Sequence, residues 1–284
     1  MNTLDLILQK TTTLPPYPVV VQKVLHLVDD PKSSAEDLVG VIQYDQALTA
    51  HILRVCNSAY FGLRRPIHSI REALVRIGFN QLLEIIMSYG SAYLFSRAYQ
   101  GYDLAEGDLW RHSVASALLS QIISKHMNQE KTTVQFTAAL LHDIGKIMLN
   151  EHVKENFPEI QKLVHEKNYS FIEAERAVLG TDHAEVGGKI SEKWQFPQVL
   201  AFGIQYHHSP FLAPSDQELV SLIYLCDVIA MMTGFGGGAD GLAYHGQKKI
   251  MKQHGLTAKD VEQIISQLED RLHQVESLLN MGTG

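Results

Sequence analysis

The chain has 284 residues, which suits two domains of about 150 residues or one large domain, and it can bury a core without disulfide staples. Apolar residues make up 45% and charged residues 19%, values that exclude disordered, collagen-like and coiled-coil chains. The net charge of −7 argues against non-specific binding to nucleic acids or to anionic membranes.

Cysteine usage and the absence of targeting signals indicate a cytoplasmic protein. Only Cys56 and Cys226 occur, each within an apolar helical pattern, which excludes a disulfide framework and favours a reducing compartment. The N-terminus lacks the basic segment and apolar core of a secretory signal. The best membrane candidate, 219–232, is too short to span a bilayer and contains Asp227.

The first hundred residues carry signals for five short helices. Pro18 suits the first turn of the first one. Ser33-x-x-Glu36 and Ser69-x-x-Glu72 are capping-box patterns, and Asp45 can cap a further helix. The expected helices cover 18–29, a segment after Ser33, 46–57, 70–78 and 81–94.

A polar stretch over 99–107 indicates a connection, after which helical patterns resume. We expect helices over 108–127, 132–142, 151–167, 171–179, 183–194, 197–208, 216–232 and a last amphipathic helix that ends near residue 280. The glycine-rich stretch 234–241 predicts a flexible loop, and it lacks the lysine and hydroxyl of a phosphate-binding P-loop. No alternating strand pattern is present, so we predict an all-α fold, with a smaller helical lobe at 1–100 and a larger one at 101–284.

One local sequence dominates the chemistry, His142-Asp143-Ile144-Gly145-Lys146, which follows an apolar helix. His142 and Asp143 place a nitrogen ligand beside a carboxylate that can bridge two cations, and Gly145 lets the chain turn. Lys146 brings a positive charge to the same place. A His-Asp pair alone is a weak signal, because such a pair also occurs by chance on surface loops.

Further histidines and an aspartate supply partners for this pair. Asp227 interrupts an apolar helix, where a buried carboxylate without a cation or donors would cost several kcal/mol. With the pair above, five of the 14 histidines and two aspartates form the candidate ligand set: His112, His142, Asp143, His183, His207, His208 and Asp227. Such ligands suit iron, manganese, zinc or nickel better than calcium.

The order His112, His142-Asp143, Asp227 resembles the signature of HD-domain phosphohydrolases, which bind divalent metals and hydrolyse phosphate esters. His183 and His207-His208 resemble the extended ligand set of the HD-GYP cyclic-di-GMP phosphodiesterases. That resemblance implies two or more ions, often iron or manganese, and implies that Lys146 approaches the substrate phosphate.

The N-terminal half resembles the HDOD domain, an HD-related output domain of bacterial signalling proteins. The resemblance is carried by Leu14-Pro15-Pro16-Tyr17-Pro18 and by the segments 41–49, 53–61 and 69–74. With the HD-like half included, it covers about residues 5–235 and implies an HD-superfamily-like helical bundle.

The two resemblances imply different functions. The HDOD resemblance implies an interaction or regulatory module without catalysis. The HD-GYP resemblance implies a metal-dependent phosphodiesterase, with Asp143 between two ions and Lys146 at the phosphate. Ser209-Pro210-Phe211 stands where that family has Gly-Tyr-Pro after its histidine pair, which favours the regulatory alternative and puts cyclic-di-GMP specificity in doubt.

The partners expected from these resemblances are signalling proteins supplied in trans, with a phosphate ester or a cyclic dinucleotide as a ligand. The last amphipathic helix carries a stripe of apolar residues at helical spacing from Val261 to Leu279. We expect this stripe to pack on the body of the protein, with a homodimer contact as the alternative. Nucleic acid is not an expected partner.

Overall fold

The computed structural model describes residues 4, 18–129, 133–234 and 247–280. Within these ranges the regular structure is helical, and β-pairing is limited to one isolated bridge between Tyr99 and Leu104. The all-α fold predicted from the sequence is confirmed. No helix in these ranges combines the length and apolar character that crossing a bilayer requires.

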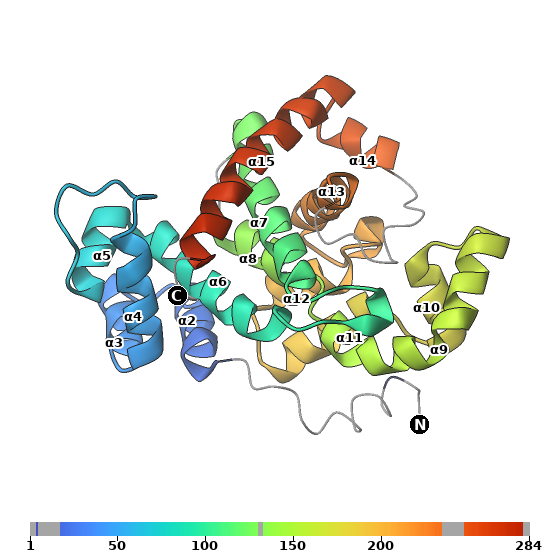
Figure 1. Ribbon diagram of the computed structural model, residues 1–284, viewed down its shortest axis with the longest axis horizontal. Coiled ribbons are helices and arrows are strands. Elements are labelled where there is room, and N and C mark those ends of the chain that lie inside the picture. Colours follow the sequence, from blue (N-terminus) through green and yellow to red (C-terminus); the bar gives the residue numbers. More distant parts are fainter. Residues whose placement is uncertain (1–3, 5–17, 130–132, 235–246, 281–284) are drawn as a thin grey trace.

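Four short helices gather at one end of the molecule (Figure 1). They are α2 (Val19–Asp29), α3 (Ala35–Ile42), α4 (Gln46–Cys56) and α5 (Ile70–Ile77). We call them the N-terminal group. Each packs through a short apolar stripe, since α2 and α3 contact each other and α5 contacts both α3 and α4.

Polar caps fix where these helices begin, and one cap differs from the prediction. Asp45 and Ser69 accept hydrogen bonds from backbone N–H groups in the first turns of α4 and α5, as expected. The capping box of α3 is formed by Ser34 and Asp37 rather than by Ser33 and Glu36. Both pairs have the same spacing and similar chemistry, so the pattern alone could not choose between them.

Helix α6 (Phe79–Phe95) leads from the N-terminal group into the rest of the chain, where it packs against α7 and α8. It begins two residues before the predicted run at 81. The following connection contains a 3-10 turn, η1 (Gln100–Tyr102), which packs against α9. Tyr102 is fully buried there.

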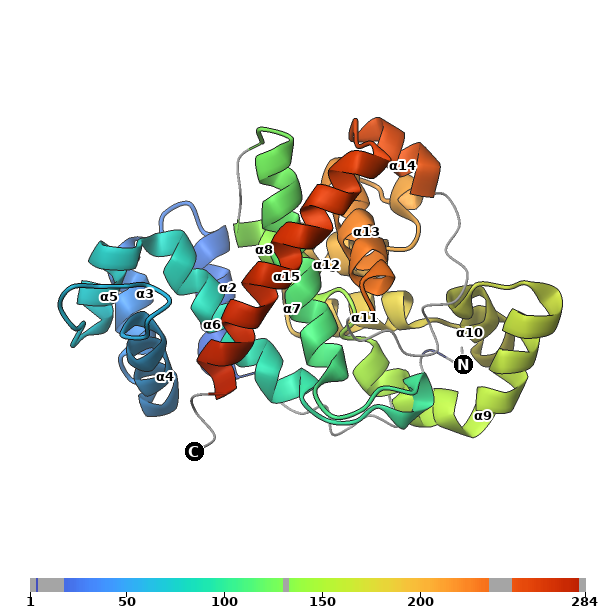
Figure 2. The same ribbon diagram turned by 45° about the horizontal axis from the view of Figure 1, so that its top comes forward.

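The larger part of the molecule is a bundle around α7, with α9 and α10 at the end away from the N-terminal group (Figures 1 and 2). Its elements are α7 (Asp108–His126), α8 (Thr133–Leu141), α9 (Lys146–Lys167), α10 (Phe171–Leu179), α11 (His183–Lys193), α12 (Gln198–Gln205), η2 (Pro210–Leu212), α13 (Gln217–Met232), α14 (Gln247–Gln253) and α15 (Ala258–Asn280). Helices α8, α13 and α15 all pack on α7.

Two boundaries in this bundle differ from the sequence prediction. Helix α9 begins at Lys146 instead of near residue 151, because Gly145 has helical dihedral angles and lets the helix start directly after the His-Asp pair. Helix α12 ends at Gln205, so His207 and His208 lie in the turn that follows it. The predicted loop at 234–241 lies outside the described residues except for Gly234.

Helix α15 lies along α7 in both views and points towards the N-terminal group (Figures 1 and 2). Val261, Ile264, Leu268 and Leu272 of its apolar stripe are buried against the body, as expected. One apolar core includes residues from α2 through α15. The division of the chain at residue 100 remains a prediction.

Candidate metal centre

The seven candidate ligands converge in one buried cluster, although they come from five places in the bundle. Helix α7 supplies His112 and α13 supplies Asp227, each from the middle of a helix. The others lie at helix ends: His142 and Asp143 after α8, His183 as the first residue of α11, and His207 and His208 after α12.

Burial of the cluster is nearly complete. His112, His142, Asp143, His183, His207 and Asp227 are at most 2% exposed, and the side chain of His208 is 9% exposed. Buried charged groups of this kind need partners or a bound ion, because removing them from water costs several kcal/mol each.

The first part of the cluster joins α7, α8 and α13. His112 Nε2 lies 3.1 Å from Asp227 Oδ1 and 3.3 Å from His142 Nε2. His142 Nε2 lies 3.7 Å from the same Asp227 oxygen. Two ring nitrogens and a carboxylate oxygen therefore face one point, and this trio could hold a metal ion.

The second part joins α11 to the turn after α12. His183 Nε2 lies 2.9 Å from His208 Nε2, and His207 is close enough to complete a three-histidine group that could hold another ion. His208 also connects the two parts, since its Nδ1 lies 3.8 Å from Asp227 Oδ2.

Asp143 lies between the two parts, and each of its carboxylate oxygens faces a different one. Asp143 Oδ2 lies 3.6 Å from His112 Nε2 and 3.4 Å from His142 Nε2. Asp143 Oδ1 lies 3.5 Å from His183 Nε2 and 3.8 Å from His207 Nε2. This is the arrangement of a carboxylate that can bridge two cations.

Hydrogen bonds at Nδ1 fix the orientation of three of the histidine rings. His142 Nδ1 donates to the carbonyl of Ala139 at 2.7 Å, and His207 Nδ1 donates to that of Ile204 at 2.6 Å. His183 Nδ1 lies 2.7 Å from Glu175 Oε2. Since carbonyl and carboxylate oxygens accept, the Nδ1 atoms carry protons and the Nε2 atoms are left for a metal.

His207 Nε2 is the atom of the cluster that most clearly lacks a bonding partner. It is buried without a hydrogen-bond partner, in a protein interior where such atoms are normally satisfied. Its nearest carboxylate oxygen, Asp143 Oδ1, lies 3.8 Å away, beyond hydrogen-bond distance. An ion between these atoms would satisfy both, so the residues present fit a divalent transition metal.

Glu175 and Tyr102 support the cluster and were missed from the sequence. Glu175, on α10, is fully buried and accepts a hydrogen bond from the backbone N–H of His183 as well as contacting its ring. Tyr102 Oη donates to the other Glu175 oxygen at 2.6 Å. A carboxylate behind a ligating histidine fixes the ring and raises the basicity of its free nitrogen. A signal was present, because Glu175 shares the buried face of α10 with Phe171 and Ala174.

Close backbone packing brings the two parts of the cluster together. A Cβ atom on Gly145 would lie 1.8 Å from the carbonyl oxygen of His183 and 2.7 Å from the amide nitrogen of Gly187. Gly145 has φ −66°, a value open to every residue, so its role differs from the turn expected from the sequence. It allows the start of α9 to contact α11, and no side chain fits in the gap.

Lys146 lies inside the cluster instead of in solvent. It is 3% exposed, and its Nζ donates to Asp143 Oδ2 at 2.6 Å. The same Nζ lies 5.6 Å from the centre of the Tyr102 ring. Lys146 therefore supplies a fixed positive charge to the carboxylate that lies between the two parts.

The carboxylates and two of the histidines stabilise one another's charged forms. Burial alone would raise the pKa of Asp143 and lower that of His142, but their mutual attraction outweighs it and shifts both the other way. In the same way, burial opposes protonation of His183, and the Glu175 carboxylate overcomes this and raises its pKa to about 9. Burial would also raise the pKa of Asp227, which the neighbouring His112 and His142 rings hold well below its usual range.

His207 and His208, in contrast, stay neutral. Burial lowers the pKa of His207 to about 3, with help from the neighbouring charges of His142 and His183. Burial and His207 hold the pKa of His208 well below its usual value. Metal binding to the cluster would therefore displace protons from His142 and His183, whereas His207 and His208 are already neutral imidazoles.

Comparisons with known proteins agree with the fold. The profile of the HDOD domain matches residues 14–210. A curated uncharacterised protein of Treponema pallidum is 23% identical over 212 residues, which are 74% of this chain and 40% of that protein. The chain thus spans about two fifths of the length of that relative.

Two solved structures share the fold over nearly their whole length. An HDOD domain protein of unknown function from Geobacter sulfurreducens is 24% identical, with a TM-score of 0.75 and coverage of 97% of this chain and 95% of the other. A candidate phosphohydrolase from Shewanella amazonensis is 23% identical, with a TM-score of 0.67 and 93% coverage of both chains. At these identities the likeness concerns the fold alone.

Proposed function

Since the chain belongs to the HDOD domain family, we propose that it is a regulatory module of bacterial signal transduction whose buried histidine–aspartate cluster holds divalent transition metal. One observation carries the metal-binding part of the proposal. The two oxygens of Asp143 face two separate groups of histidines, one of which contains the unpartnered Nε2 of His207.

The donor set favours two ions, with iron or manganese ahead of zinc or nickel. His112, His142 and Asp227 would hold one ion, and His183, His207 and His208 would hold the other, with Asp143 shared between them. Imidazole and carboxylate ligands suit these metals, whereas calcium prefers oxygen ligands alone.

Burial supports a regulatory role for the cluster. His208 is the most exposed of the seven ligands at 9% of its side chain, and Lys146 is 3% exposed. A phosphate ester would have to displace packed side chains to reach Asp143. A buried centre of this kind can still couple metal occupancy to the packing of α7, α11 and α13, which carry three of its ligands, and of α8 and α12, which the other four follow. Signalling partners supplied in trans would read that packing.

The compartment and the partners belong to the same proposal. Cys56 and Cys226 are buried free thiols, which agrees with a reducing cytoplasm. Val261, Ile264, Leu268 and Leu272 of the apolar stripe of α15 are buried within the chain, so these four side chains are not available to a homodimer contact.

A second candidate function is metal-dependent hydrolysis of a phosphodiester or phosphate monoester. The observation that favours it is the pair Lys146–Asp143, which places a lysine ammonium beside the shared carboxylate. The solved relative described as a candidate phosphohydrolase agrees with it. A bound divalent ion acts as a Lewis acid and can lower the pKa of water towards about 7. Lys146 would hold its proton and stabilise negative charge on the phosphoryl oxygens.

Metal analysis combined with a hydrolysis assay tests both functions. The chain is purified without oxygen from cells supplied with iron or manganese, and its metal content is measured. The wild type should carry about two ions per chain, and Asp143→Ala, which removes the shared carboxylate, should lose most of them. Asp270→Ala, an exposed change on α15, is the matched control and should keep both.

The hydrolysis assay uses bis-p-nitrophenyl phosphate and cyclic dinucleotides with the loaded protein. Bound metal without turnover supports the regulatory module. Turnover that disappears in Asp143→Ala establishes the second candidate instead. A wild-type protein that binds no transition metal, even reduced and without oxygen, overturns both.

A further inference from the structure

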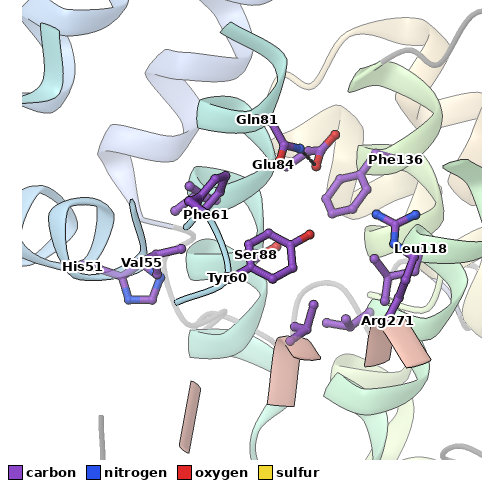
Figure 3. Close-up of a pocket in the computed structure, with 13 residues that line it drawn as sticks. His51, Val55, Tyr60, Phe61, Gln81, Glu84, Ser88, Leu118, Phe136 and Arg271 are labelled. Atoms are coloured by element: carbon purple, nitrogen blue, oxygen red, sulfur yellow. Dashed lines mark hydrogen bonds between the residues drawn. The ribbon is translucent and has the colours of Figure 1, made fainter. Parts of the chain in front are cut away.

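A small cavity lies between the N-terminal group and the bundle, away from the metal cluster. Its volume is about 80 Å³, and its walls come from α4, the segment after α4, α6, α7, α8 and α15 (Figure 3). We call it the junction cavity. None of the seven candidate metal ligands lines it.

Apolar side chains form most of its wall. Val55 from α4, Leu118 from α7 and Phe136 from α8 are nearly buried, at 4–8% exposure. Phe61 and Tyr60, which stack edge to face on each other, close the side formed by the N-terminal group. Tyr60 is 39% exposed, so an aromatic ring stands at the border with solvent. Such walls suit a flat or branched apolar body.

A chain of polar groups crosses from α6 to α15 beside these walls. Glu84 accepts hydrogen bonds from the side-chain amides of Gln81 and Gln121, one at each oxygen. Gln121 in turn accepts a hydrogen bond from Arg271 Nη2 at 2.6 Å. The side-chain amide of Gln121 therefore links the charges of Glu84 and Arg271.

Arg271 has more donors than this chain uses. A guanidinium carries five N–H donors in a fixed planar fork, and the Gln121 oxygen accepts from one nitrogen. Its side chain lines the cavity together with Phe136 and Leu118 (Figure 3). Glu84, by contrast, already receives a donor at each oxygen. Arg271, rather than Glu84, is therefore the residue suited to bind a ligand, and it would bind a hydrogen-bond acceptor.

We propose that the junction cavity binds a small organic carboxylate with a single aromatic ring or a branched aliphatic body. The carboxylate would take the remaining donors of Arg271 in a charge-assisted pair, and the apolar body would lie against Phe61, Leu118 and Phe136. The volume is several times what one water molecule needs, so it has room for a ring and little more.

A ligand there would contact both the N-terminal group and the bundle. It would touch α4 and α6 on one side and α15 on the other, and so stabilise one relative position of these helices. The site is independent of the metal centre, and its test does not depend on whether metal binds.

Calorimetric titration of the full chain with benzoate tests the proposal, with benzyl alcohol and benzylamine as probes of the same shape. Benzoate should bind at least about tenfold more tightly than either, which is the expected worth of a charge-assisted hydrogen bond in a partly buried site. Equal binding of all three would overturn the carboxylate class. An absence of heat from all three would show an unfilled packing gap and overturn the site.

Variants of residues that line the junction cavity test whether benzoate binds there. Arg271→Gln should weaken benzoate binding about tenfold or more, while Arg271→Lys should keep part of it, because the charge remains and the fork is lost. Lys259→Gln, an exposed change on the same helix, is the matched control and should bind as the wild type. Ser88→Leu places an apolar side chain in the cavity and should abolish binding without loss of thermal stability. Benzoate binding unchanged in both Arg271→Gln and Ser88→Leu would overturn the assignment to this cavity.

Discussion

The N-terminal group and the bundle that contains the candidate metal centre are built on opposite principles. Among the described residues 18–90, no polar or charged side chain is buried, and the core consists of valine, leucine, isoleucine and similar residues. The described part from Ser91 to Asp227 contains 19 buried polar or charged side chains, including every candidate metal ligand except the partly exposed His208.

This difference indicates that the core of the N-terminal group serves stability, whereas the buried charges of the bundle serve a function. Apolar burial stabilises a fold by itself, at about 25 cal/mol per Å² removed from water. Buried charges usually cost free energy unless they are paired, so a concentration of them is maintained for a purpose other than stability. The N-terminal group can therefore absorb changes that the bundle cannot, and the following predictions measure that contrast.

The largest contrast involves two glycines. Gly145→Ala would push a Cβ atom into the His183 carbonyl, so we expect a loss of about 3 kcal/mol or more in the free energy of unfolding. Gly40→Ala, in α3, meets nothing within 4 Å and should stabilise by about 0.5–1 kcal/mol because alanine favours helix. Urea denaturation measures both. Equal changes in the free energy of unfolding for the two variants would refute the contrast between the bundle and the N-terminal group.

The next largest effect should be the loss of metal affinity when Glu175, which contacts the His183 ring, is changed. Glu175→Gln leaves the shape in place but removes the charge that holds the His183 ring, so one of the two ions should be bound about 10–100-fold more weakly. The ion held by His112, His142 and Asp227 should remain. Metal titration of the apoprotein measures both affinities. Glu159→Gln, an exposed change on α9, is the control. If Glu175→Gln binds both ions with the affinities of the wild type, a positioning role for Glu175 is refuted.

A smaller effect is expected from pH in the N-terminal group. Partial burial of the ring, with the nearby charge of Arg54, lowers the pKa of His51 from 6.5 to about 4 in the folded protein. Between these two values the unfolded chain binds the proton and the folded chain does not, so stability falls as the pH falls from 6.5 to 4.

The matched measurement compares His51→Gln with the wild type by urea denaturation across that range. The variant should lose about 1–2 kcal/mol less on acidification, a value reduced for the partial solvent exposure of the ring. His68→Gln, an exposed change in the same group, should follow the wild type. Parallel curves for His51→Gln and the wild type would contradict the expected proton uptake.

The smallest effect should come from the ion pair between Arg71 and Glu36 on the surface of the N-terminal group. Their side chains are 66% and 56% exposed, and such pairs contribute about 1 kcal/mol or less. We expect Arg71→Ala to change the midpoint of thermal unfolding only slightly, and less in high salt than in low salt. A loss comparable to that of Gly145→Ala would show that the N-terminal group also depends on charge.

Part of the candidate cluster could be predicted because some of its members carry a local signal. Asp227 breaks an apolar helix, and His142-Asp143 follows one directly, so both stand out without any knowledge of the fold. Their convergence in the structure agrees with the family resemblance. The metal, its number of ions and the role of Lys146 remain proposals, because ligand chemistry allows several metals.

The features that the sequence did not reveal depend on long-range packing. Gly145 has an ordinary helical conformation, and its importance appears only when His183, 38 positions later, is placed against it. Tyr102 lies in a stretch with the composition of a surface connection, yet it is buried against Phe171 and Glu175. Such contacts leave no local pattern, whereas caps at Asp45 and Ser69 were found because capping is local.

The hydrogen bond from Arg271 to Gln121 joins residues 150 positions apart. During synthesis, α6 and α7 leave the ribosome before α15 is made. The Glu84–Gln121 pair therefore lacks its contact with Arg271 until the end of the chain has been synthesised. Closing so long a loop also makes this contact a late event in folding. The junction at Arg271 therefore also bears on the order of folding, since a nascent chain can complete neither this contact nor the α15 part of the apolar core until α15 has been made.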